Sequence, residues 1–191
     1  MIKMVKIEVS DLMGKITVGE VMSINPLMME KDVSLFDALK ISVQKGASAI
    51  IVTDNGVPAG IVTDRDIVTK VVYRALNPFD IKLEDIMTKP IITVKKDDPL
   101  EKAALLINKK KVRKLPVIED GMIVGLLSEN NIVKISPDLL LIAEKEEKNE
   151  GKEFQDEDIY YTGICEGCGK FSHELKYKNG MFLCPNCIND Y

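Results

Sequence analysis

The 191-residue sequence lacks an apolar run long enough to cross a membrane. Its apolar stretches fall short of the ~20 consecutive residues that a membrane helix needs. Residues 1–6 are interrupted by lysines and lack the apolar centre of a signal peptide. These absences predict a cytoplasmic protein with no membrane partner.

An excess of positive charge is also lacking. The chain has 26 Lys and Arg against 30 Asp and Glu, a formal net charge of −4. Nucleic-acid binding depends on basic side chains that neutralise several phosphates. The composition therefore disfavours a nucleic-acid partner, although a nucleic-acid-associated transcriptional regulator remains an alternative.

Cysteine is absent from the first 164 residues, so most of the chain depends on no disulfide. Two Cys-x-x-Cys pairs follow, Cys165 with Cys168 and Cys184 with Cys187. This spacing is typical of a four-cysteine zinc site, in which two turns complete a tetrahedron of thiolates. A reducing compartment disfavours the alternative of two disulfides. The pattern predicts bound zinc, and iron would also fit four thiolates.

The region around the cysteines has too few apolar residues to fold unaided, so the metal would supply the missing stability. Because protein ligands fill all four positions, we expect a structural rather than a hydrolytic metal. His173, the single histidine, is surplus to this set and has no predicted ligand role. The segment resembles a zinc ribbon. Its Cys-Pro-x-Cys also resembles a rubredoxin knuckle, which leaves an iron redox protein as a further alternative.

The rest of the chain repeats itself. Residues 31–68 match residues 96–133 without a gap when the numbering is shifted by 65, the offset between Gly60 and Gly125 (125 − 60). Self-similarity at a fixed offset indicates a repeat architecture. One unit of this size would bury too little apolar surface alone. We therefore expect two copies to pack against each other.

Each copy predicts the order extended segment, helix, strand, turn, strand, helix. In the first copy the last helix is expected from Thr63 to about Leu76. In the second copy Asp98 is expected to cap a helix with Pro99 at its first position. Ser136 is expected to start a closing helix. The fold class is α/β (α+β), with predicted strands at 49–53, 59–62, 115–118 and 123–127.

The predicted domain organisation follows from these patterns. An acidic, hydrated linker separates the repeats from the cysteines. The segments are an N-terminal arm (1–16), a first repeat (17–76), a second repeat with its closing helix (77–142), the linker (143–158) and a small metal-bound β-ribbon (159–191).

The repeat resembles a tandem pair of CBS domains, or Bateman module. Five features carry the resemblance: Val-Met at 21–22, Pro-Ile-Ile-Thr-Val at 90–94, Lys-Leu-Pro-Val-Ile at 114–118, and Gly-x-x-Thr/Ser at 60–63 and 125–128. The resemblance covers roughly residues 15–138 and implies two pseudo-symmetric β-α-β-β-α repeats, homodimerisation and a regulatory, non-catalytic role. Inosine-monophosphate dehydrogenase carries such a pair, but its catalytic barrel would need about 250 residues.

Two interpretations of Thr63-x-x-Asp66 stay open. The hydroxyl and carboxylate could hold a phosphate oxygen and a ribose diol at a helix start. The same spacing fits a capping box, in which the carboxylate bonds back to the chain. The pattern returns 65 residues later as Ser128-x-x-Asn131.

The resemblance implies adenine-nucleotide binding, of AMP, ADP or ATP, in the clefts between the repeats. Family members use the aspartate for the ribose hydroxyls and Thr or Ser for phosphate. Thr63 and Asp66, with Arg65 between them, match both positions, so the first repeat is favoured. In the second repeat Ser128 matches, but Asn131 lacks the charge that strengthens such bonds.

Family members often place a basic residue before the apolar strand to meet phosphate. Arg113 and Lys114 do so in the second repeat, whereas Ser48 and Ala49 occupy the matching places in the first. The resemblance thus implies a ribose-binding acid on one repeat and phosphate-binding cations on the other, so that either one ligand draws on both repeats or the two sites differ in strength. The predicted protein is an adenine-nucleotide sensor whose ribbon contacts an unknown protein partner.

Overall fold

A computed structural model describes residues 16–135, Leu141 and residues 159–190. These residues form two compact units. One, the first-repeat unit, contains residues 25–93 and 159–190; the other, the second-repeat unit, contains residues 16–24, 94–135 and Leu141. Of the helices formed by these described residues, none is both long and apolar enough to span a bilayer.

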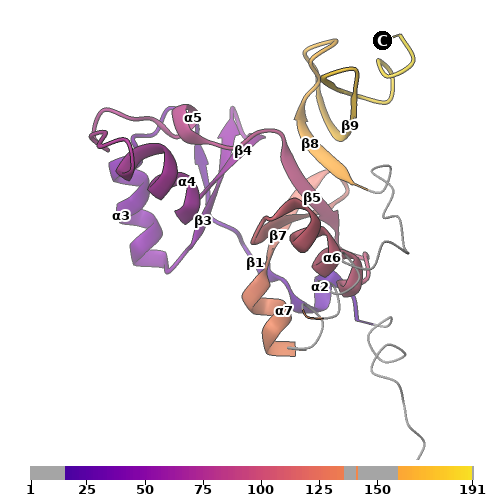
Figure 1. Cartoon of the computed structure of the whole chain (residues 1–191), viewed down its shortest axis with the longest axis horizontal. Coiled ribbons are helices and arrows are strands. Elements are labelled where there is room, and N and C mark those ends of the chain that lie inside the picture. The colour runs from indigo at the N-terminus through magenta and orange to yellow at the C-terminus, as the bar shows by residue number, and fades with distance from the viewer. Residues whose placement is uncertain (1–15, 136–140, 142–158, 191) are drawn as a thin grey trace, which may run out of the picture. The chain divides into compact units, whose positions relative to one another are not determined.

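The first-repeat unit is built on a three-stranded sheet of order β2-β3-β4, in which β2 is parallel to β3 and β3 is antiparallel to β4. Helices α3 and α4 lie on the same face of this sheet (Figure 1). Buried side chains from the sheet and from α3 and α5 form its core. The elements are β2 (Met28–Glu30), α3 (Leu35–Lys45), β3 (Ala49–Asp54), β4 (Val57–Thr63), α4 (Asp64–Ile67), the π-helix η1 (Val68–Val72) and α5 (Leu83–Ile86).

The helix expected from Thr63 to Leu76 is shorter and less regular than predicted. It consists of α4 and the π-helical turn η1, and the chain turns away at Ala75, whose φ is +53°. The Thr69 hydroxyl donates a 2.7 Å hydrogen bond to the carbonyl of Arg65, four residues back. Back-bonding of this kind competes with the regular helix ladder and bends helices.

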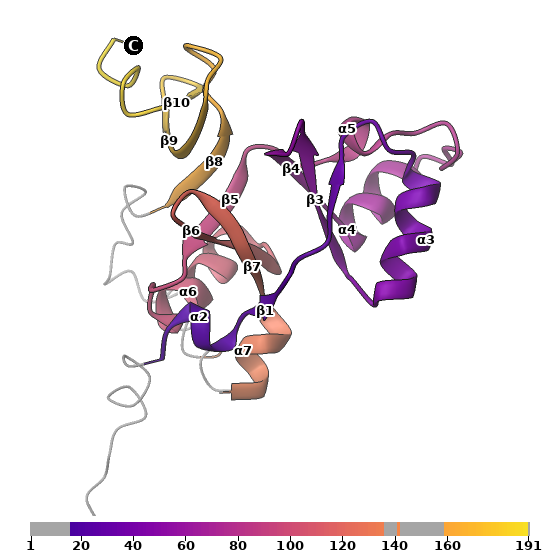
Figure 2. The same cartoon turned by 180° about the vertical axis from the view of Figure 1, so that it is seen from behind.

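The second-repeat unit repeats this arrangement. Its strands lie in the order β1-β7-β6-β5, and α6 packs against α7 (Figure 2). Strand β5 (Ile91–Lys95) begins in the first-repeat unit, and its Val94 pairs with Val117 in the same parallel register as Met29 with Val52. The other elements are α2 (Val18–Val21), β1 (Ser23–Ile24), α6 (Leu100–Lys110), β6 (Lys114–Glu119), β7 (Met122–Ser128) and α7 (Glu129–Ile135).

The four predicted strands are confirmed as β3, β4, β6 and β7, each slightly longer than expected. The expected cap of α6 is wrong by one residue, since the N-cap is Pro99 and the helix begins at Leu100. The Asp98 carboxylate instead accepts hydrogen bonds from the Lys95 amide and the Lys102 ammonium. The N-terminal arm, the acidic linker and all of the closing helix but Leu141, which is helical, lie outside the described residues.

The opening helix of each sequence repeat packs in the unit built on the other repeat. In the first-repeat unit, the Glu84 amide of α5 donates to the carbonyl of Lys31 at 3.0 Å. In the second-repeat unit, the Gly19 amide of α2 donates to the carbonyl of Lys96 at 2.8 Å. The repeats predicted at 17–76 and 77–142 are therefore units of sequence, because the opening helix of each one packs with the remainder of the other.

The cysteine module is an antiparallel sheet of β8 (Tyr160–Ile164), β9 (Phe171–Lys178) and β10 (Met181–Leu183). Strand β8 also pairs with β5, with Thr162 opposite Ile91. The hydroxyls of Thr93 and Thr162 lie 3.1 Å apart and are buried between these strands. The module is therefore joined to residues 91–93 of β5 within the first-repeat unit.

Candidate functional site

Thr63 lies at the end of β4 and Asp66 in the first turn of α4. Asp66 Oδ2 accepts hydrogen bonds from the Thr63 amide at 2.9 Å and from its hydroxyl at 2.6 Å. The carboxylate therefore reaches back to the start of its own helix, which is the return bond of a capping box. The side chain is nearly buried, with 10% of it exposed.

The other carboxylate oxygen, Asp66 Oδ1, contacts two further side chains. It accepts from the Thr88 hydroxyl at 2.8 Å and lies 2.8 Å from the Lys70 ammonium. Thr88 is held beside β4 by two backbone hydrogen bonds with Ile61. Burial alone would raise the pKa of Asp66, but hydrogen bonds from Lys70, Thr63 and Thr88 outweigh it and lower the pKa below its ordinary value.

Glycine at position 60 allows a close approach at this site. A Cβ atom on Gly60 would lie 2.6 Å from Met87 Sδ and 2.9 Å from Met87 Cβ. No real side chain tolerates such a distance, so glycine lets the segment carrying Met87 and Thr88 pack directly on β4. This packing brings Thr88 to Asp66.

The remaining first-repeat residues lie around the same strand end. Ala49 is buried directly opposite Thr63 in the β3–β4 pair, and Ser48 precedes it. Arg65 is exposed on α4. The structure therefore brings Ala49 opposite Thr63, but Ala49 supplies no charge for a phosphate.

The second repeat has the same geometry with neutral groups. Asn131 Oδ1 accepts from the Ser128 amide at 3.0 Å and from the Ser128 hydroxyl, while its Nδ2 donates to Ser23 Oγ at 3.4 Å. Ser23 is the residue that a shift of 65 places on Thr88 (88 − 65). Lys114 lies opposite Ser128 in the β6–β7 pair.

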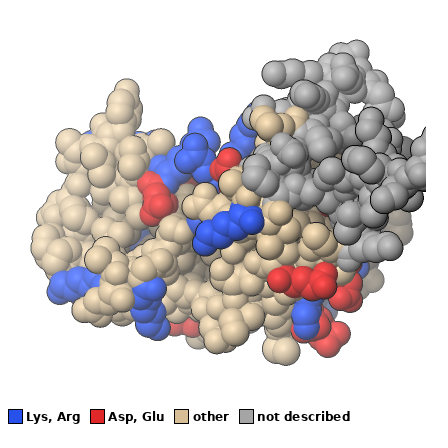
Figure 3. Space-filling model, turned by 90° about the horizontal axis from the view of Figure 1, so that it is seen from below, with Lys and Arg blue, Asp and Glu red and all other residues tan. Residues whose placement is uncertain are grey.

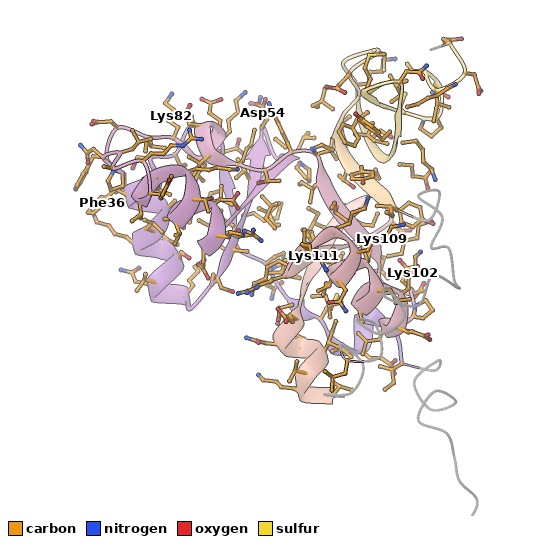
Figure 4. All side chains as sticks on the ribbon, viewed as in Figure 1. Phe36, Asp54, Lys82, Lys102, Lys109 and Lys111 are labelled. Carbon is orange, nitrogen blue, oxygen red and sulfur yellow. The ribbon has the colours of Figure 1, made fainter. Side chains whose placement is uncertain are left out.

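Arg113 precedes β6 and is largely exposed. Its carbonyl accepts from the Glu129 amide at 3.1 Å, and its Nε lies 3.7 Å from Glu129 Oε2. Lys109 and Lys111 lie at the C-terminal end of α6 (Figure 4), where cations are favoured by the helix dipole. On the face shown in Figure 3, the described basic side chains form small separate groups, with acidic side chains close to some of them.

Sequence reasoning missed Lys70. Its ammonium contacts Asp66 Oδ1, and it donates to the Ile86 carbonyl at 2.6 Å and to the Thr88 hydroxyl at 3.0 Å. Two signals in the sequence could have identified Lys70. It lies four residues after Asp66, a spacing that pairs opposite charges on a helix. Its match in the second repeat is Ile135 (135 − 65), which cannot form an ion pair.

The four cysteines form a compact cluster, as predicted. Their Sγ atoms all lie within 4.8 Å of one another, and those of Cys168 and Cys184 are 3.9 Å apart. A tetrahedral ion with metal–sulfur bonds of ~2.3 Å places its sulfurs about 3.8 Å apart. The Cys184 amide donates to Cys165 Sγ at 3.2 Å, and Gly169, with φ +71°, closes the first turn. The donor set and its spacing fit one zinc or iron ion.

The electrostatics of the cluster also fit a cation. Burial raises the pKa of the Cys165 thiol, but amides of Cys184, Cys168 and Gly167 lower it to about 6. Hydrogen bonds with the sulfurs of Cys168 and Cys184 raise the pKa of Cys187 to about 12. Neighbouring sulfurs thus oppose one another's ionisation, and a bound dication would favour all four as thiolates.

His173 is not part of the cysteine cluster. Its ring meets Phe171 edge-on, with centroids 4.6 Å apart, and burial lowers its pKa. Its Nδ1 is buried without a hydrogen-bond partner.

Fold and sites together define a tandem pair of CBS domains that carries a four-cysteine module. The CBS-domain family model matches residues 18–73 and 83–138, and the chain belongs to this family. An uncharacterised protein of Methanocaldococcus jannaschii is 36% identical over 92% of this chain and 94% of its own length. One of Methanopyrus kandleri is 34% identical over 75% of each chain.

Solved structures share the fold. A CBS domain pair in complex with 5′-methylthioadenosine and S-adenosyl-L-methionine is 25% identical, with a TM-score of 0.57 over 63% of this chain and 94% of that one. A hexameric CBS-CP12 protein from bloom-forming cyanobacteria is 27% identical, with a TM-score of 0.60 over 71% and 82%. The inosine-5′-monophosphate dehydrogenase of Nitrosopumilus maritimus is 34% identical over 60% of this chain but only 23% of the enzyme.

Proposed function

We propose that this protein is a non-catalytic regulator whose CBS pair senses an adenine nucleotide, AMP, ADP or ATP. Support comes from its family and from the related CBS pair that was solved with two adenosine compounds. The observation that carries the proposal is the nearly buried Asp66 carboxylate, held between the hydroxyls of Thr63 and Thr88. A charged acceptor among hydroxyls suits a ribose diol.

The two repeats would differ in their affinity for the nucleotide. In the first, Asp66 would accept the ribose hydroxyls and Thr63 would contact phosphate. In the second, Asn131 offers a neutral oxygen to a ribose, although Arg113 and Lys114 add positive charge near Ser128. Because hydrogen bonds to a charged acceptor are about twice as strong, we assign the tighter site to the first repeat.

The test is calorimetric titration of the metal-loaded protein with AMP, ADP and ATP, using Asp66→Asn as the variant. This substitution copies the second repeat, so the side chain keeps its size and part of its hydrogen bonding. We expect the tightest binding to be lost in Asp66→Asn and retained in Asn131→Ala. Absence of binding to all three nucleotides would refute the proposal and leave Asp66 as a helix cap.

We further propose that the four cysteines hold a structural zinc ion, with iron as the alternative. The cluster of sulfurs within 4.8 Å of one another supports this. When bound, the ion would hold four thiolates together and so stabilise the turns that close β8–β10. Elemental analysis of the purified protein decides between the metals, and ferric iron on four thiolates would also colour it red. A metal-free, folded module would contradict the proposal.

Homodimerisation is proposed through apolar side chains that the first-repeat unit leaves exposed on η1 and beyond. Tyr73 is 87% exposed and Val72 65%, and Leu76 and Phe79, a few residues further along the chain, are also exposed. Phe79 stacks on Phe36 of α3, which Figure 4 labels, with ring centroids 4.0 Å apart. Exposed apolar groups gathered in this way are typical of an interface. The cysteine module is proposed to contact a separate protein partner.

A further inference from the structure

Lys70 neutralises the carboxylate on which the proposed ribose contact depends. Its ammonium has three donors, and three acceptors meet it: Asp66 Oδ1, the Ile86 carbonyl and the Thr88 hydroxyl. Asp66 in turn receives the Thr63 amide and hydroxyl on one oxygen, and Thr88 and Lys70 on the other. A carboxylate has about four acceptor positions, so all of them are occupied.

The second repeat lacks both members of this ion pair. Asn131 stands in the place of Asp66 and Ile135 in the place of Lys70, while Ser23 corresponds to Thr88. The hydrogen bond from Asn131 to Ser23 is kept, at 3.4 Å. The acid and the base are thus present together in one repeat and absent together from the other, as expected of two residues that act as one ion pair.

We infer that Lys70 is the phosphate-binding cation of the first-repeat site and that Asp66 holds it in place while no ligand is bound. The inference rests on the proposed function. A ribose diol that donates to Asp66 Oδ1 would displace the Lys70 ammonium. The freed ammonium lies on a flexible four-carbon side chain and needs an anionic partner, because leaving it unpaired beside a buried carboxylate site is unfavourable. The phosphate of the same nucleotide supplies that partner.

This exchange accounts for the missing cation in the first repeat. Ser48 and Ala49 occupy the places where Arg113 and Lys114 stand in the second repeat, so the strand start offers no charge. Lys70 reaches Asp66 from the π-helix η1, and its side chain is 32% exposed. π-helical turns are frequent at functional sites.

A preference among ligands follows. A nucleotide both breaks the Asp66–Lys70 pair and gives Lys70 a new partner, whereas an uncharged nucleoside only breaks it. The first-repeat site therefore selects phosphorylated adenosine over adenosine itself. Replacing Lys70 by an apolar residue should change the two affinities in opposite directions.

The experiment titrates AMP and adenosine into the metal-loaded full chain and into Lys70→Ile, the residue that the second repeat has at this position. We expect AMP to bind about tenfold or more weakly to the variant, since a charge-assisted hydrogen bond is lost. Adenosine should bind severalfold more tightly, because no ammonium competes for Asp66. Lys134→Ile, which removes an equal charge from an exposed position on α7, controls for net charge.

Each outcome separates the inference from the proposed function. If AMP binds the wild-type chain but Lys70→Ile leaves both affinities unchanged or shifts both in the same direction, the inference is overturned and nucleotide binding stands. Tight AMP binding that persists with wild-type affinity in Asp66→Asn places the tighter site elsewhere and also overturns it. If neither compound binds either protein, the proposed function fails and the inference fails with it.

Discussion

The two repeats allow the stability of the Asp66–Lys70 pair to be measured against a matched neutral pair. Three variants form a double-mutant cycle: Asp66→Asn, Lys70→Ile and both together. The double variant reproduces the pair Asn131 and Ile135 of the second repeat. If charge pairing governs this site, the double variant should be more stable than Asp66→Asn alone.

The magnitudes follow from burial. Asp66→Asn leaves the Lys70 ammonium against Thr88 and the Ile86 carbonyl with no counter-charge. Breaking a fully buried pair costs about 3–5 kcal/mol. The carboxylate is 10% exposed but the ammonium 32%, so solvent reduces this to about 2–3 kcal/mol. Lys70→Ile leaves Asp66 with its hydroxyl and amide donors, and should cost about 1–2 kcal/mol.

The double variant should lose less than Asp66→Asn alone, so the coupling must exceed the cost of Lys70→Ile and should be about 2 kcal/mol or more. The assay is urea unfolding followed by far-UV circular dichroism on metal-loaded protein, because guanidinium would screen the pair. A mirror cycle, Asn131→Asp with Ile135→Lys, installs the pair in the second repeat and should show coupling of the same sign. Additive losses in the first cycle would refute the assignment of Lys70 as the counter-ion.

Four other perturbations test the remaining conclusions. Because the pKa of Asp66 is lowered in the folded protein, the carboxylate contributes stability above its unfolded pKa of about 3.9, and this contribution disappears as pH falls through the lower folded pKa. The urea midpoints of wild type and Asp66→Asn should therefore converge in acid. A constant difference between the two midpoints at all pH values would contradict this. Cys187→Ser, or removal of the metal by a chelator, should release β8 from β5 and raise hydrogen exchange at the strand amides, whereas unchanged protection would show that the module folds without metal. Gly60→Ala should cost about 1–3 kcal/mol in urea unfolding because its Cβ would overlap Met87, and a neutral effect would mean that the Met87 segment moves freely. Tyr73→Asp should shift the protein towards monomer in light scattering coupled to size-exclusion chromatography, and an unchanged mass would place any dimer interface elsewhere.

Local sequence patterns predicted elements well where a few neighbouring residues decide the conformation. Ser34, whose hydroxyl and helix-start position suit an N-cap, accepts the Asp37 amide at 3.1 Å at the start of α3, and Gly46, with φ +61°, ends that helix. Cys-x-x-Cys spacing predicted the sulfur cluster for the same reason, because each pair forms its own turn. Local patterns failed at η1, where a hydroxyl competes with the helix ladder, and at Asp98, whose carboxylate bonds to neighbours instead of capping.

The sequence by itself determined the repeat, the order of strands and helices, the Thr63–Asp66 motif and the four-cysteine cluster. These depend on side-chain types at short or fixed spacings, which are visible in the chain without packing. Tertiary structure alone decided that α2 and α5 are exchanged between the units, that β8 pairs with β5, and that Thr88 joins Lys70 on Asp66. Those contacts join residues far apart in sequence, and they form because buried strands and charges need partners that only the packed chain supplies.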